Sequence, residues 1–141
     1  MEHLEEITAA VALGGAGDRE AARTQLTALW EKVDDRQTRC AIAHYLADVQ
    51  DETEDELTWD LRALEVVEDL QWLPSLHLNL ADDYRRLAQS PQAEEHLQLA
   101  RQHLHLLPAD GYGELIRSAV DHVAEALAAG NTQRLPSNPS T

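Results

Sequence analysis

The chain has 141 residues, about the size of one domain, and its 26 acidic and 11 basic residues give a net charge of −15 with histidine neutral. This charge repels phosphate backbones and anionic headgroups, so nucleic acid and membrane surfaces are not expected as partners. No apolar run is long enough to span a bilayer, and the single cysteine, Cys40, excludes an internal disulfide. We therefore expect a soluble, cytoplasmic protein without a leader segment, and ten arginines against one lysine are typical of a GC-rich bacterial genome.

Apolar residues recur at helical spacing from the beginning of the chain, and no window alternates as a strand would. A short helix through Leu4 and Val11 is expected to end at the glycines of residues 14–17. A second helix is expected to follow Asp18, which suits the N-cap position. The two helices are predicted to form an antiparallel hairpin over residues 2–33.

Two further hairpins are predicted over residues 35–73 and 74–108. Thr53 precedes Glu56 by three residues, which is the spacing of a capping box. We expect this box to begin the second helix of the hairpin over residues 35–73. In the other hairpin, Pro74 and Pro91 suit the first turns of the two helices, with Ser90 as N-cap. Because Pro108 lies late, the last helix of this hairpin is expected to run nearly a turn long.

A seventh helix over residues 110–130, with Asp110 as its N-cap, is expected to cap the domain. The predicted fold is thus an all-α domain over residues 1–130, with antiparallel helical hairpins stacked as a short solenoid of about seven helices. Residues 131–141 are rich in Ser, Pro and Asn and are predicted to be a disordered tail.

The third hairpin carries Asn79-Leu80-Ala81-x-x-Tyr84, followed by a small residue, a leucine and another small residue at Ala93, Leu97 and Ala100. These spacings resemble the tetratricopeptide repeat (TPR), and Ala47 lies 34 residues before Ala81. Residues 110–117 are also similar to a run in short actinobacterial TPR proteins, for which no activity is settled. The resemblance implies a right-handed solenoid and a concave groove, lined by the first helix of each hairpin, that holds a partner segment.

The predicted peptide-binding groove is lined by charged residues that share one side of a helix. We expect an acidic inner strip, rimmed by arginines, that binds a protein or peptide partner carrying Arg or Lys. An ordinary solvated face of an acidic protein is the alternative. The predicted groove residues are His44, Asp48, Asp51, Leu78, Asp82, Arg85, Arg86, Tyr112 and Arg117.

We expect no catalytic residues, no metal and no cofactor. The acidic stretch over residues 48–60 lacks the central glycine and the ligand spacing of a calcium loop. The histidines form none of the usual helical metal motifs, and His77 is expected to be a core residue bonded to a carbonyl. A less favoured alternative is a magnesium-dependent nucleotide hydrolase using the carboxylates of residues 65, 68, 82 and 83, but no basic loop for phosphate accompanies them.

A different alternative is that the chain serves self-association. Three repeats without strongly polar caps leave apolar faces at the ends of the stack. A homodimer or a larger homo-oligomer would cover these faces.

Overall fold

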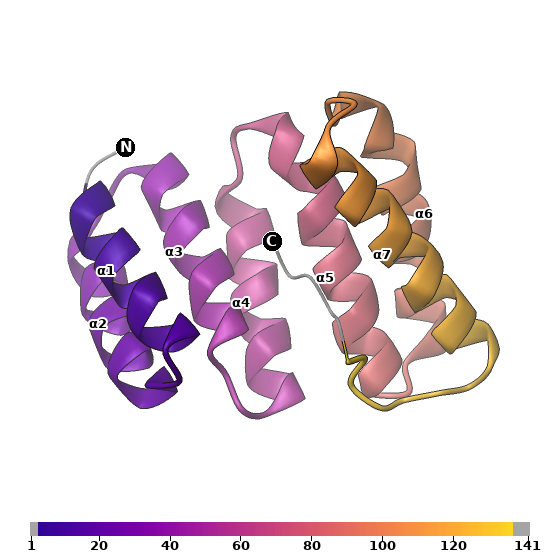
Figure 1. The fold of residues 1–141 in the computed structure, drawn as a ribbon, viewed down its shortest axis with the longest axis horizontal. Helices are drawn as coiled ribbons and strands as arrows, with labels where there is room; N and C mark the ends of the chain where they lie inside the picture. Colours follow the sequence, from indigo (N-terminus) through magenta and orange to yellow (C-terminus); the bar gives the residue numbers. More distant parts are fainter. Residues whose placement is uncertain (1–2, 137–141) are drawn as a thin grey trace. The chain divides into compact units, whose positions relative to one another are not determined.

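The computed structural model describes residues 3–136, and in this range it contains seven α-helices, two short 3-10 helices and no strand (Figure 1). The predicted all-α fold of consecutive helical hairpins is therefore confirmed. Contacts divide the chain into two compact units, unit 1 over Met1–Glu68 and unit 2 over Asp69–Thr141. A single domain over residues 1–130 stays a prediction.

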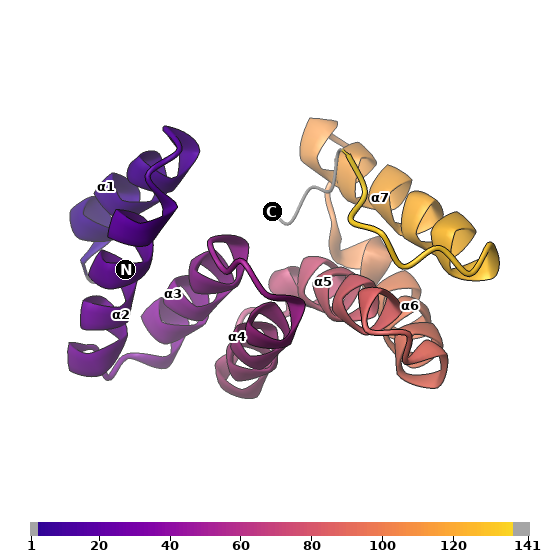
Figure 2. The same cartoon turned by 90° about the horizontal axis from the view of Figure 1, so that it is seen from below.

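Unit 1 consists of two helical hairpins. Helices α1 (Leu4–Gly15) and α2 (Arg19–Lys32) form the first, and α3 (Arg36–Asp48) and α4 (Thr53–Val66) form the second, with α2 packed against α3 (Figure 2). The core of the unit joins α1, α2 and α3 through buried aliphatic side chains. These are Ile7, Ala10, Ala22, Leu26, Leu29, Val33, Ile42, Leu46 and Val49.

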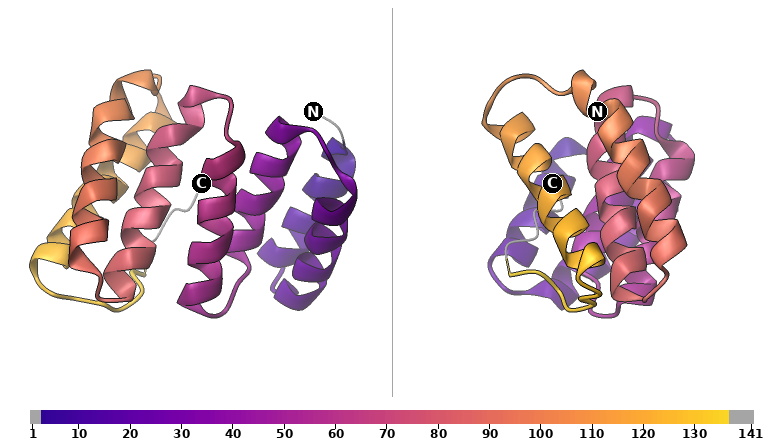
Figure 3. Two further views of the ribbon diagram at one scale, coloured as in Figure 1. Left: turned by 180° about the vertical axis from the view of Figure 1, so that it is seen from behind. Right: turned by 90° about the vertical axis from the view of Figure 1, so that its right-hand side faces the viewer.

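Unit 2 contains one hairpin and a helix that covers it. The 3-10 helix η1 (Leu70–Trp72) leads into α5 (Leu73–Arg86), and α5 pairs with α6 (Ser90–His103). After η2 (Leu104–Leu106), helix α7 (Gly111–Ala128) packs against both α5 and α6 (Figure 3). The core of this unit comprises Leu78, Ala81, Leu97, Ala100, Leu107, Ile116, Ala119, Val120 and Val123.

Two of the predicted N-caps are confirmed and two are wrong. The carboxylate of Asp18 accepts a hydrogen bond from the Ala21 amide at 3.2 Å, and that of Asp110 accepts one from the Gly113 amide at 3.0 Å. Thr53 and Ser90 instead occupy the first position inside their helices, after N-cap residues that make no side-chain cap. Before α6, the left-handed conformation of Ala88, with φ of 60°, turns the chain early enough to draw Ser90 into the helix.

The segment before Pro108 differs from the predicted long helix. The α-helix ends at His103, a 3-10 turn follows, and Leu107 is extended. The proline ring disfavours the α conformation of the residue before it, which accounts for the extended backbone of Leu107.

The beginning of the predicted disordered tail is ordered against unit 2. The carbonyl of Asn131 accepts a hydrogen bond from Arg85 at 2.5 Å, and Leu135 packs on the core of this unit. The segment 131–136 therefore belongs to the fold of unit 2. The rest of the predicted tail, residues 137–141, lies outside the described residues.

Arginine side chains hold the carboxyl ends of helices. The guanidinium group of Arg39 donates to the carbonyls of Trp30 and Val33, both at 2.8 Å, and stacks 3.6 Å above the Trp30 ring. Trp30 in turn meets Trp59 edge to face, with ring centroids 5.2 Å apart. Such cations satisfy orphan carbonyls and oppose the negative end of the helix dipole.

Within residues 3–136, no helix has the length and apolar content needed to cross a membrane.

Candidate functional site

The charged residues predicted on α5 form a buried ion-pair network. Arg85 donates to one oxygen of Asp82 at 2.7 Å and 3.0 Å, and Arg86 donates to the other at 3.1 Å. Arg86 also reaches Asp83 at 3.1 Å. Asp82 and Arg85 are each only 1 % exposed, so this network differs from the exposed strip expected from the sequence. Two cations and two anions inside the fold balance each other and favour a structural role.

Leu78, expected to line the groove, lies in the core of unit 2. It is fully buried and belongs to the same cluster as Leu97 on α6 and Ile116 on α7. On a helix wheel, Leu78 lies on the side of α5 opposite the main apolar side. The side that carries Leu78 is buried as well, because α7 packs against α5. Leu78 is therefore not available to a peptide in this structure.

In unit 1, the predicted groove residues lie along α3 and in the turn after it. His44 is 4 % exposed, and burial lowers its pKa to about 4. Asp48 is half-buried. Asp51 is exposed and accepts from Arg19 at 3.3 Å and from Arg23 at 3.2 Å.

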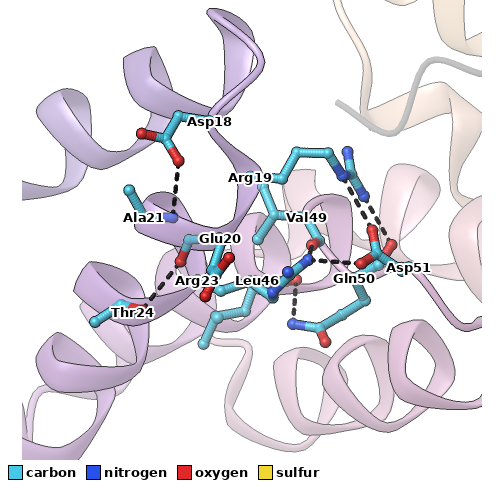
Figure 4. Close-up of polar contacts among 10 residues, drawn as sticks. All are labelled: Asp18, Arg19, Glu20, Ala21, Arg23, Thr24, Leu46, Val49, Gln50 and Asp51. Atoms are coloured by element: carbon cyan, nitrogen blue, oxygen red, sulfur yellow. Dashed lines mark hydrogen bonds and ion pairs between the residues drawn. The ribbon is translucent and has the colours of Figure 1, made fainter.

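Figure 4 shows that Arg19 and Arg23 on α2 converge on the end of α3. Arg23 donates to the Val49 carbonyl at 2.6 Å, and Arg19 donates to the Gln50 carbonyl at 2.7 Å. Asp51 completes this group by accepting from both guanidinium groups. Asp51 thus orients the arginines that join the two hairpins of unit 1.

The two predicted groove residues on α7 lie in different surroundings, since one is exposed and the other makes hydrogen bonds within the fold. Tyr112 is 42 % exposed. Arg117 donates to the carbonyls of Leu104 and Leu107, at 3.5 Å and 3.3 Å, and so holds the loop before α7. This arrangement requires Gly113, because a Cβ atom there would lie 2.1 Å from the Pro108 carbonyl oxygen.

The structure also brings together a histidine stack that the sequence analysis did not predict as a group. Nδ1 of His77 lies 3.0 Å from Nδ1 of His96, and the His77 ring stacks on both His96 and His103, with centroids 5.2 Å and 6.0 Å apart. Tyr84 stacks on the other side of His96, with centroids 5.5 Å apart. The expectation that His77 bonds to a carbonyl is therefore wrong.

Two rings of the stack, His77 and His96, resist protonation. Burial, together with the positive charge that His96 and His103 would carry, lowers the pKa of His77 to about 4, and burial also lowers the pKa of His96. Two seven-residue spacings, from His77 to Tyr84 and from His96 to His103, place these rings on facing sides of α5 and α6, which is the signal that could have revealed the stack. Across residues 3–136, no group of three or more His, Cys, Asp or Glu side chains is arranged to hold a metal ion.

A shallow groove of about 280 Å³ lies between α1 and α2 in unit 1. Ammonium and carboxylate groups of Lys32 and Glu6 form a 3.2 Å ion pair at this groove, and hydrogen bonds from His3 and Lys32 lower the pKa of Glu6. We call it the α1–α2 groove. Its lining residues are Glu6, Ala9, Gln25, Ala28, Leu29 and Lys32.

Comparisons with protein-family models, curated proteins and solved structures find no match to this chain. The resemblance to the TPR superfamily, and the function that it implies, stay predictions.

Proposed function

We propose that this protein is a non-catalytic, TPR-like protein-binding module that holds a partner segment along α1, the first helix of its first hairpin. The proposal is carried by an uncharged, exposed stripe on α1. Leu4 is 57 % and Val11 is 38 % exposed, and the exposed residues Thr8 and Gly15 continue the stripe at helical spacing. Large apolar side chains left in solvent at one helix face are typical of a contact surface.

Several other residues predicted to line the groove already make contacts within the fold, which supports α1 as the binding helix. Asp82 and Arg85 are committed to the ion-pair network of α5, and Arg117 holds the loop before α7. These side chains serve the fold, whereas the α1 stripe lies exposed at the surface. A binding role for α1 accordingly needs no rearrangement of unit 1.

The charge of unit 1 indicates the chemistry of the partner. Seventeen of the 26 acidic residues and six of the 11 basic residues precede residue 69, so unit 1 has a net charge of −11. A partner segment with apolar anchors and with Arg or Lys between them would match both the stripe and this charge. We place the interaction in the cytoplasm, since the chain has a single cysteine, Cys40, and therefore no internal disulfide.

The test is a selection of peptides that bind the full chain from a random displayed library. Selected peptides are expected to carry basic residues beside apolar anchors and to bind more weakly as salt is added. The double variant Leu4→Ser, Val11→Ser should weaken the best peptide about tenfold or more in calorimetric titration. The matched control is Leu115→Ser on α7, where the leucine is 47 % exposed and should not affect binding.

Equal affinity in the stripe variant and the wild-type chain would overturn the proposal. A preference for acidic peptides would overturn its electrostatic part. Circular dichroism of each variant ensures that a lost signal is not lost folding.

A further inference from the structure

The α1–α2 groove has an uncharged floor in an acidic unit. Ala9 and Ala28 are exposed on its two walls, and the floor is formed by Leu29, which is 3 % exposed. Most surfaces of a unit with a net charge of −11 repel another copy of the same unit. Between the charged groups of Glu6 and Lys32, the small, neutral side chains of Ala9 and Ala28 allow a second copy to approach closely.

The charges at the groove are complementary to themselves. Glu6 and Lys32 contribute one charge of each sign, and their side chains remain 51 % and 54 % exposed despite the ion pair. A two-fold axis beside this pair would bring Glu6 of one copy to Lys32 of the second copy, and the reverse. Such a pattern is what a symmetric homodimer interface requires, because one surface must match itself.

The other helices of the protein show how a hairpin is covered. Helix α3 packs against α2, and α7 packs against both helices of the α5–α6 hairpin. The groove side of the α1–α2 hairpin is still open to solvent at Ala9 and Ala28. A second copy would supply this side with helices of the same kind.

We propose that two copies of this chain dock through their α1–α2 grooves about a two-fold axis, with Glu6 of each copy paired to Lys32 of the other. The α1 stripe of the proposed function lies on another flank of the helix, so neither proposal depends on the other. Helices of 12 and 14 residues are about 18 and 21 Å long and offer several hundred Å² per copy. Because this is near the lower end of specific interfaces, we expect a reversible dimer with a dissociation constant of about 1–100 µM.

The decisive test is a charge swap followed by sedimentation equilibrium. Glu6→Lys and Lys32→Glu each place like charges across the axis, and each should weaken the homodimer about tenfold or more. Mixing the two variants in equal amounts should restore dimers, because every cross-axis contact in the mixed pair again joins a cation to an anion. The double variant Glu6→Lys, Lys32→Glu should also dimerise as the wild type does.

A second variant tests the small, neutral walls of the groove independently of the ion pair. Ala28→Arg fills the groove and should shift the protein to monomer, by about tenfold or more in the dissociation constant. The matched control Ala128→Arg, at an exposed position on α7, should leave the dimer unchanged. Circular dichroism and melting curves show whether each variant is folded.

Three results would overturn the proposal. The first is a wild-type chain that remains monomeric at about 1 mM. The second is a dimer that persists in folded Ala28→Arg. The third is a pair of charge-swap variants that fail to dimerise when mixed, even though each is folded.

Discussion

Helix α1 in unit 1 and helix α5 in unit 2 have similar lengths but very different surroundings. Of the 12 residues of α1, two are buried, whereas 11 of the 14 residues of α5 are buried. Helix α5 contacts both α6 and α7, and its charges pair inside the fold. The comparison shows that charged residues on one side of a helix do not indicate an exposed surface, because a helix later in the chain can cover that side.

The two units also differ in charge. Unit 1 carries −11 and unit 2 carries −4, with the acidic side chains Asp82 and Asp83 of unit 2 held in contact with arginines. Unit 1 is therefore the one expected to respond to salt and to a basic partner, and unit 2 the one whose polar groups stabilise the fold.

The largest expected effect tests this difference directly. Asp82→Ala leaves the buried guanidinium of Arg85 without its main partner and should lower the free energy of unfolding by about 3–5 kcal/mol. Asp51→Ala, which removes the exposed carboxylate that pairs with Arg19 and Arg23 in unit 1, should cost less than about 1 kcal/mol. Urea denaturation of both variants measures the contrast, and equal costs would contradict it.

A smaller effect is expected from the close approach before α7. Gly113→Ala places a methyl group against the Pro108 carbonyl and the Arg117 guanidinium, and should destabilise unit 2 by about 3 kcal/mol. Gly111→Ala, two residues earlier, meets no atom within 4 Å and should change stability by less than about 0.5 kcal/mol. Thermal melting of the two variants separates a steric cause from loss of glycine flexibility. A similar cost at both positions would favour flexibility.

The stability of unit 2 is expected to depend on pH through its histidine stack. The pKa of His77 is about 4 in the folded chain and near 6.5 when unfolded, so below pH 6.5 the unfolded chain takes up a proton that the folded chain excludes. Stability should therefore fall as the pH falls from 6.5 toward 4, by about 3 kcal/mol for this residue. In His77→Gln this part of the loss should disappear. The exposed His122→Gln is the control, and urea titrations over this pH range measure both.

The smallest expected changes in the free energy of unfolding come from substitutions in the turns of two hairpins. Unit 1 places Gly17 at a φ of 97°, whereas unit 2 places Ala88 at a φ of 60°, a conformation that strains a residue with a Cβ atom. Ala88→Gly should raise the free energy of unfolding by about 0.5–1 kcal/mol, and Gly17→Ala should lower it by about 1 kcal/mol. Changes of the same sign in the two variants would show that turn strain is not the cause.

Helix positions and several helix ends could be predicted from the sequence because they depend on local spacing and on caps. Asp18 and Asp110 were identified in this way, and both accept the expected amide hydrogen bonds. Ser90 was misplaced by one residue. Its place depends on the left-handed conformation of Ala88, which an alanine in the sequence does not indicate.

The candidate site was less predictable because it depends on contacts between helices. The wheel of α5 placed Asp82 and Arg85 together correctly, but only the packing of α7 and the Asn131 carbonyl decides that this side is closed. The histidine stack had a readable signal in its paired seven-residue spacings. The α1–α2 groove had none, because alanines at a helix surface look the same in the sequence whether they line a groove or face open solvent.

Lys32 is the only lysine of the chain, and its exposed side chain lines the α1–α2 groove. Among the side chains of this protein, an amine-reactive fluorophore therefore has a single attachment point. Since Cys40 is buried, a thiol-directed dye would give no comparable handle without engineering. A dye attached to this side chain would report, through its emission, occupancy of the neighbouring surface.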